Sequence, residues 1–170
     1  ADVTSLEVRE GQHVKQGDTL IIMDDSEAGL VVEQRRSEVE DIKAQINSEK
    51  NRHKNDLAAL KLEKSLVEIA ETKLEREEKT SKSNLTSKSS YDTQKQALQS
   101  QQLALKARQL NINNHPARLA QLEARLKQKQ AQLEQSEKDL KRTLVTAPFD
   151  GIVLKTHVSP GERVRGGEIL

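Results

Sequence analysis

Apolar residues recur at every seventh position along most of this chain. One series starts near residue 32 and a second near residue 91, inside a stretch, 26–143, that is rich in Lys, Glu, Gln, Leu and Ala. This composition favours helix, and a strict seven-residue repeat favours a left-handed coiled coil. The sequence therefore predicts two long helices that share a seam. Residues of that predicted seam include Val39, Ile46, Leu60, Val67, Leu74, Tyr91, Leu98, Leu105, Leu119 and Leu126.

The two series also match each other as an antiparallel pair. Facing residues in such a pair have positions with a constant sum, and Leu74 with Tyr91 and Leu60 with Leu105 both sum to 165. The reflection point falls between residues 82 and 83, where Ser, Thr and Asn interrupt the helical composition. The pattern predicts one hairpin with its turn near residues 80–87, since a single unbroken helix would leave this match unexplained.

The second helix carries another seven-spaced series, about 160° around the helix from the first at about 100° per residue. Its residues are Leu103, Leu110, Ala117, Ala124 and Ala131. A hairpin needs one seam, so this stripe either faces another copy of the hairpin or is ordinary helix surface. The sequence leaves both interpretations open.

Both ends of the chain follow a different pattern, in which β-branched residues alternate with glycines. Residues 1–25 and 144–170 read as short strands and turns. The spacing of valine and glycine from Val8 to Leu20 recurs 150 positions later, from Val158 to Leu170. Glycine permits the positive φ of tight turns. The candidate turn glycines are Gly11, Gly17, Gly151, Gly161 and Gly167.

Each β segment is too short to bury a core alone. We therefore expect residues 1–25 and 144–170 to close one small β-sandwich together, with residues 26–143 inserted between them as the hairpin. The predicted fold class is α+β.

Composition supports this picture and narrows the function. Of 170 residues, 34% are hydrophobic, 1% aromatic and 32% charged, and the net charge is +1. This composition fits long solvated helices better than a thick core. The balanced charge and the lack of stacking aromatics argue against a nucleic-acid partner. The chain has no cysteine, and no apolar run approaches the ~20 residues that span a bilayer.

Residues with catalytic or metal-binding chemistry are sparse and scattered. His53 lies in the predicted seam opposite Ile112, where we expect a packed side chain. Asp24 and Asp25 point to opposite faces if extended, so they mark the end of the first β segment, with Asp25 or Ser26 capping the next helix. No phosphate-binding loop or nucleophile elbow is present. The sequence predicts no catalytic, cofactor or metal site and no enzyme.

Pro116 stands inside the second predicted helix. It follows the asparagine-rich run 111–114, whose helix propensity is low. Because proline removes a backbone hydrogen bond, we expect a kink or local break there that acts as a flex point.

The two β segments and the intervening hairpin resemble the membrane fusion proteins, the periplasmic adaptors of the haemolysin-secretion-D type. The most specific stretch is Leu140-x-Arg142-Thr143-x-x-x-Ala147-Pro148-Phe149-Asp150-Gly151-x-Val153. The resemblance covers the whole chain and implies that the β segments are two halves of a lipoyl-like domain. It implies a non-enzymatic adaptor between an inner-membrane transporter and an outer-membrane channel, hexameric when assembled. It also implies a periplasmic location, with an inner-membrane anchor outside this chain.

The resemblance extends to the hairpin tip. Members of the family carry the pattern Arg-x3-Leu-x6-Ser, which contacts the channel, and this chain has Arg76, Thr80 and Ser87 at those spacings. Thr80 replaces the usual leucine. Export of drugs or other substrates is the leading expectation. The alternatives are an adaptor of type I protein secretion, which the long hairpin leaves open, and a plain coiled-coil spacer without an export role.

Overall fold

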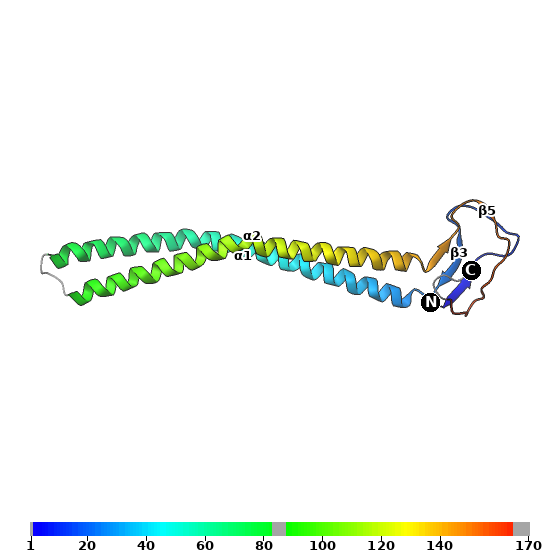
Figure 1. Ribbon diagram of the computed structural model, residues 1–170, viewed down its shortest axis with the longest axis horizontal. Helices are drawn as coiled ribbons and strands as arrows, with labels where there is room; N and C mark the ends of the chain where they lie inside the picture. The colour runs from blue at the N-terminus through cyan, green and yellow to red at the C-terminus, as the bar shows by residue number, and fades with distance from the viewer. Residues whose placement is uncertain (1, 83–87, 165–170) are drawn as a thin grey trace. The chain divides into compact units, whose positions relative to one another are not determined.

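The computed structural model describes residues 2–82 and 88–164 (Figure 1). Ser87 and Gly167, two of the candidate residues, lie outside the described residues. Within these ranges the elements follow one another as β1 (Val3–Leu6), β2 (His13–Val14), β3 (Thr19–Met23), α1 (Ser26–Lys82), α2 (Lys88–Lys141), β4 (Leu144–Thr146) and β5 (Gly151–Ile152).

The chain divides into two compact units. The first unit comprises residues 1–42 and 125–170, and the second comprises residues 43–124. The first unit therefore contains all the strands together with the beginning of α1 and the end of α2. The second unit contains the remaining parts of the two helices.

The sheets of the first unit are built from both ends of the chain. In the three-stranded sheet the order is β1–β3–β4, so β3 lies between a strand of its own half and a strand of the other half. Both pairings are antiparallel. A smaller sheet pairs β2 with β5. We call the two sheets and the segments that connect their strands, within residues 2–25 and 144–164, the β body. Because each sheet needs strands from both ends, neither half can form the β body alone.

The two halves repeat each other's backbone hydrogen bonds at an offset of 150 residues. The amide of Val3 donates to the carbonyl of Glu162 at 2.8 Å, and the amide of Val153 donates to the carbonyl of Gln12 at 2.9 Å. These are the same bond in two copies. The repeat seen in the sequence is therefore also a repeat in structure.

Strand pairing shows the same internal symmetry. His13 of β2 pairs with Ile152 of β5, and Asp2 forms an isolated antiparallel bridge with Arg163. Position 163 is 150 residues after position 13, and position 2 is 150 residues before position 152, so the two pairs are equivalent in the repeat. The Arg163 guanidinium also donates to the Asp2 carboxylate at 2.8 Å, which lowers the pKa of that carboxyl.

Among the described residues, the core of the β body consists of two small apolar clusters, and both halves of the chain contribute to each. The first cluster joins Val3, which is 2% exposed, and Ile21 with Val158 and Val164. The second cluster joins Val8 and Val14 with Ala147. Burial of apolar side chains therefore depends on the pairing of segments about 150 residues apart.

Three of the predicted turn glycines have the backbone conformation that glycine was expected to provide. Gly11, Gly17 and Gly161 have φ of 81°, 91° and 86°, a region that side chains with a Cβ disfavour. Gly151 differs, because it begins strand β5 and pairs with Val14. The bend comes just before it, where the Asp150 carboxylate accepts a hydrogen bond from the amide of Gln16 at 2.7 Å.

Asp25 stands at the N-cap position of α1, one of the two positions that the sequence suggested, and the neighbouring Asp24 supplies side-chain hydrogen bonds at this helix start. The Asp24 carboxylate accepts hydrogen bonds from the amide and the hydroxyl of Ser26, at 3.0 and 2.6 Å. These bonds lower the pKa of Asp24. The carbonyl of Asp25 accepts the first helical bond, from Gly29 at 2.7 Å.

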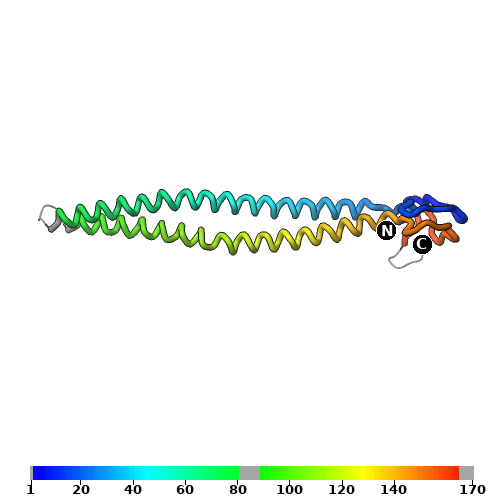
Figure 2. The backbone as a smooth tube through the Cα atoms, turned by 90° about the horizontal axis from the view of Figure 1, so that it is seen from above, coloured from blue at the N-terminus to red at the C-terminus, as the bar shows by residue number. Residues whose placement is uncertain are grey.

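In the second unit α1 and α2 run side by side in opposite directions, as two perpendicular views show (Figures 1 and 2). The predicted fold class, a helical hairpin inserted between the halves of a small β-sandwich, is confirmed.

The local break expected at Pro116 is not present, because α2 is helical from Lys88 to Lys141. Proline deprives the carbonyl of Ile112 of its usual amide partner. The neighbouring carbonyl, that of Asn111, accepts a hydrogen bond from the Arg118 guanidinium at 3.0 Å. This side-chain bond adds a polar contact to the helix beside the proline.

Candidate functional site

The predicted seam residues differ in how deeply they are buried. Val39, Ile46 and Val67 of α1 are buried. The others are half-buried: Leu60, Leu74, Tyr91, Leu98, Leu105, Leu119 and Leu126. Two helices alone cannot cover every seam side chain fully, because each helix has only one neighbour to pack against.

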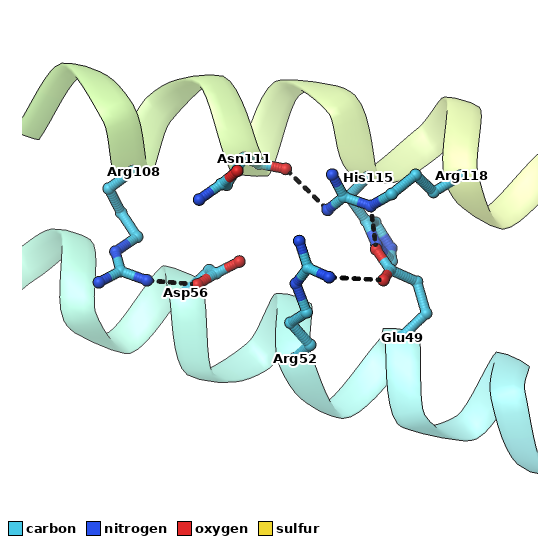
Figure 3. Close-up of polar contacts among 7 residues, drawn as sticks. All are labelled: Glu49, Arg52, Asp56, Arg108, Asn111, His115 and Arg118. Atoms are coloured by element: carbon cyan, nitrogen blue, oxygen red, sulfur yellow. Dashed lines mark hydrogen bonds and ion pairs between the residues drawn. The ribbon is translucent and has the colours of Figure 1, made fainter.

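Charged side chains occupy the other seam position of the second unit, and Glu49 is the most contacted of them (Figure 3). Only 8% of the Glu49 side chain is exposed. Its carboxylate accepts hydrogen bonds from Nδ1 of His115 and Nε of Arg118, both at 2.9 Å. Arg52 lies 3.9 Å away on the same helix. An ionised carboxylate can only accept, so the His115 proton sits on Nδ1.

A second charged group surrounds Arg108 of α2. Its guanidinium donates to the Asp56 carboxylate at 2.6 Å and to the Glu63 carboxylate at 3.0 and 3.1 Å. Asp56 and Glu63 lie seven residues apart on α1, so one arginine spans two turns of the opposite helix. We call the residues of these two groups, together with His53, the polar seam: Glu49, Arg52, His53, Asp56, Glu63, Arg108, His115 and Arg118.

His53 completes the polar seam by stacking on His115. The two rings are 3.8 Å apart between centroids and inclined by 7°. His53 is therefore a packed seam residue, as its position in the heptad series suggested, and its ring stacks on that of His115.

Hydrogen bonds in the polar seam shift two pKa values. The pKa of Glu49 is lowered, chiefly by the hydrogen bond from His115 and further by Arg118, although burial opposes the shift. The pKa of Arg108 is raised by its bonds to Glu63 and Asp56. Both shifts favour the charged forms of Glu49 and Arg108, which are the hydrogen-bonded centres of the two groups.

The polar seam could have been found in the sequence from the sign of its charges. Glu49 with His115 and Asp56 with Arg108 have positions that sum to 164, one less than the apolar series. A carboxylate opposite a basic residue at a constant sum is the signature of antiparallel helices paired by charge.

Two of the three tip candidates are described, and both lie on α1. Arg76 is exposed. The Thr80 hydroxyl donates to the carbonyl of Arg76 at 2.8 Å, so its one proton is used within the helix. Near this end of the second unit, Ser90 of α2 is hydrogen-bonded to the Glu77 carboxylate of α1. The two described tip candidates thus lie near the end of α1, close to a point where the two helices are in contact.

Three further properties of the described chain bear on metal binding, on membrane insertion and on ligand binding. Across residues 2–82 and 88–164, no group of three or more His, Cys, Asp or Glu side chains is arranged to hold a metal ion. None of the helices in the described ranges could cross a membrane. The β body has an open groove of 480 Å³ with a mostly apolar lining that includes Leu6, Val8, Leu20, Phe149 and Val153.

A helical hairpin inserted between the symmetric halves of a β-sandwich defines a class, the barrel-sandwich hybrid domains of membrane fusion proteins. Residues 1–169 match the family described as "CzcB-like, barrel-sandwich hybrid domain". The chain belongs to this family, and its resemblance to membrane fusion proteins is confirmed. Comparison by sequence with curated proteins gives no match.

Solved structures show the same fold. The periplasmic adaptor protein EmrA is 16% identical with a TM-score of 0.52, and the match covers 99% of this chain and 67% of EmrA. MacA from Actinobacillus actinomycetemcomitans is 25% identical with a TM-score of 0.59, covering 98% of this chain and 43% of MacA. The soluble domain of LipC, a membrane fusion protein of a type I secretion system, is 15% identical with a TM-score of 0.50, covering 99% and 93%. The chain thus spans less than half of MacA and about two thirds of EmrA.

Proposed function

We propose that this protein is a periplasmic adaptor, a non-enzymatic subunit that links an inner-membrane transporter to an outer-membrane channel for export. The observation that carries the proposal is the β body, in which β3 of one half pairs with β4 of the other. The hairpin therefore begins and ends in a β body whose sheets form only when the two ends of the chain pair with each other. A plain coiled-coil spacer has no need of such a β body, whereas an adaptor must hold its hairpin on a fixed support.

The comparisons support this assignment. EmrA is described as a periplasmic adaptor and LipC as a membrane fusion protein. For this protein we propose the same location, the periplasm, with an anchor in the inner membrane. Self-association, in a hexamer, would bring several hairpins together at one channel.

The tip residues Arg76, Thr80 and Ser87 are our candidates for contact with the channel. Arg76 is exposed and positively charged, suited to carboxylates or carbonyls at the helix ends of a partner. The Thr80 hydroxyl already donates its hydrogen bond to a carbonyl of its own helix, so Thr80 offers a partner only a methyl group and an acceptor oxygen. Each contact is therefore weak, and several copies that bind at once would supply the affinity.

A reversal of charge at the tip tests the proposal in cells that lack the natural gene. Full-length protein with Arg76→Glu should accumulate normally but fail to restore export. The matched control is Arg125→Glu, which makes the same change at an exposed position of α2 in the other compact unit and should restore export fully. Full export with Arg76→Glu at normal protein level would remove this residue from the docking contact.

The exported substrate distinguishes two forms of the proposal. Loss of the gene should either sensitise cells to small toxic compounds or stop the appearance of a particular protein in the medium. The first result indicates efflux of drugs or similar compounds, and the second indicates a type I protein-secretion adaptor, the role described for LipC. A plain spacer predicts neither result.

A further inference from the structure

Two histidines from different helices meet inside the second unit. His53 of α1 and His115 of α2 stack in parallel with their centroids 3.8 Å apart. The His115 side chain is only 10% exposed. Nδ1 of His53 is buried and has no hydrogen-bond partner among residues 2–82 and 88–164. A proton added to this stack would therefore place charge in the seam itself.

The surrounding charges are balanced before any such proton arrives. From α1 the carboxylates Glu49, Asp56 and Glu63 and the guanidinium of Arg52 belong to the polar seam, and from α2 it receives Arg108 and Arg118. Three arginines thus oppose three carboxylates while both imidazoles are neutral. Each proton taken up by the stack makes the cluster more positive.

We propose that the His53–His115 stack is a pH-sensitive joint, in which proton uptake by the two imidazoles loosens α1 from α2 in the second unit. Stacked rings at 3.8 Å cannot both carry positive charge without repulsion, and the low dielectric of a seam strengthens that repulsion. His115 can share its charge with Glu49, to which it is hydrogen-bonded. Nδ1 of His53 has no such acceptor in the described part of the chain, so separation of the helices is its route to water.

The direction of the effect follows from proton linkage. Stability falls with falling pH wherever the open state binds more protons than the closed state. Histidine is the side chain that gains charge between about pH 8 and 5. The Glu49 carboxylate stays ionised through this window, because the hydrogen bond from His115 lowers its pKa. The loosening should therefore appear between about pH 7.5 and 5.5.

Amide exchange of the full chain, followed by mass spectrometry and corrected for the intrinsic effect of pH, tests the proposal. Peptides that cover residues 46–60 and 105–120 should exchange at least about fivefold faster at the lower pH. His53→Gln, which cannot ionise, should abolish this acceleration. The matched control is His13→Gln, the same change at an exposed histidine of the first unit, which should keep the parent's response.

Two outcomes would overturn the proposal. Slower exchange at the lower pH would mean that the ion pair between Glu49 and a charged His115 tightens the seam. An unchanged acceleration in His53→Gln would mean that other groups cause it. If His53→Gln does not fold, His53→Phe replaces it, because it keeps a ring for stacking but cannot ionise. It should likewise abolish the acceleration of exchange at the lower pH.

Discussion

Removal of the Glu49 carboxylate should destabilise the paired helices of the second unit. Glu49 is 8% exposed and accepts hydrogen bonds from His115, which is 10% exposed, and from Arg118, which is 29% exposed. Glu49→Leu deletes the acceptor for both donors. Loss of an acceptor for a charged or buried donor costs about 1.5–3 kcal/mol, and the partly exposed Arg118 can recover some of this from water. We therefore expect a loss of about 2–4 kcal/mol in the free energy of unfolding.

Urea unfolding followed by circular dichroism measures this loss. The matched control is Glu75→Leu, because Glu75 also accepts a bond from a basic residue, Lys79 at 2.6 Å, but is 64% exposed. Its unfolding midpoint should stay within error of the parent's, since exposed ion pairs contribute little. Equal midpoints for Glu49→Leu and the parent would refute the reasoning, because they would mean that the buried charges do no more for stability than an apolar side chain.

The pH dependence of the same difference has a definite sign. The pKa of Glu49 is lowered in the folded chain from its ordinary value of 4.5. Its contribution is therefore fully present above pH 4.5 and is lost as the pH falls through the lowered value. The difference between the parent and Glu49→Leu should therefore shrink as the pH falls below about 4.5, where Glu49 takes up its proton.

Three further predictions concern the register, the β body and the proline. Cysteines at Leu60 and Leu105 should form a disulfide within one molecule, whereas pairs shifted by three or four residues should form it poorly; efficient bonding in a shifted register on a denaturing gel would contradict the register. Deletion of residues 144–170 removes the strands that pair with β2 and β3, so amide signals of residues 2–25 should lose their NMR dispersion while the helical signal largely remains. Pro116→Ala should raise stability against urea by about 1–3 kcal/mol, since α2 is helical through this position and regains a backbone bond; an unchanged midpoint would show that the helix has already compensated.

Periodicity in the sequence was sufficient to predict the main architecture. The apolar seven-residue series identified both helices, because a stripe that recurs every seven residues can be buried along its length only by a helical partner. The valine and glycine pattern from Val8 to Leu20 and its copy 150 residues later predicted a shared β body. Repeated residues at repeated spacings place the same demands on the backbone, as the matching positive φ of Gly11 and Gly161 shows.

Only the tertiary structure shows which residues far apart in the chain are in contact. Three features depend on how two segments meet in space. They are the stack of His53 on His115, the arginine that bridges Asp56 and Glu63, and the position of Gly151 in a strand. Periodicity assigns a residue to a face of its helix, but the partner across the seam depends on the register and on where each long side chain can reach. A shift of one residue between the apolar series and the polar seam is enough to change which side chains touch. The sequence thus determined the helices and strands and which face of each is buried, because burial acts on a whole face. The fold determined which side chains are hydrogen-bonded to each other, because a hydrogen bond joins two particular atoms.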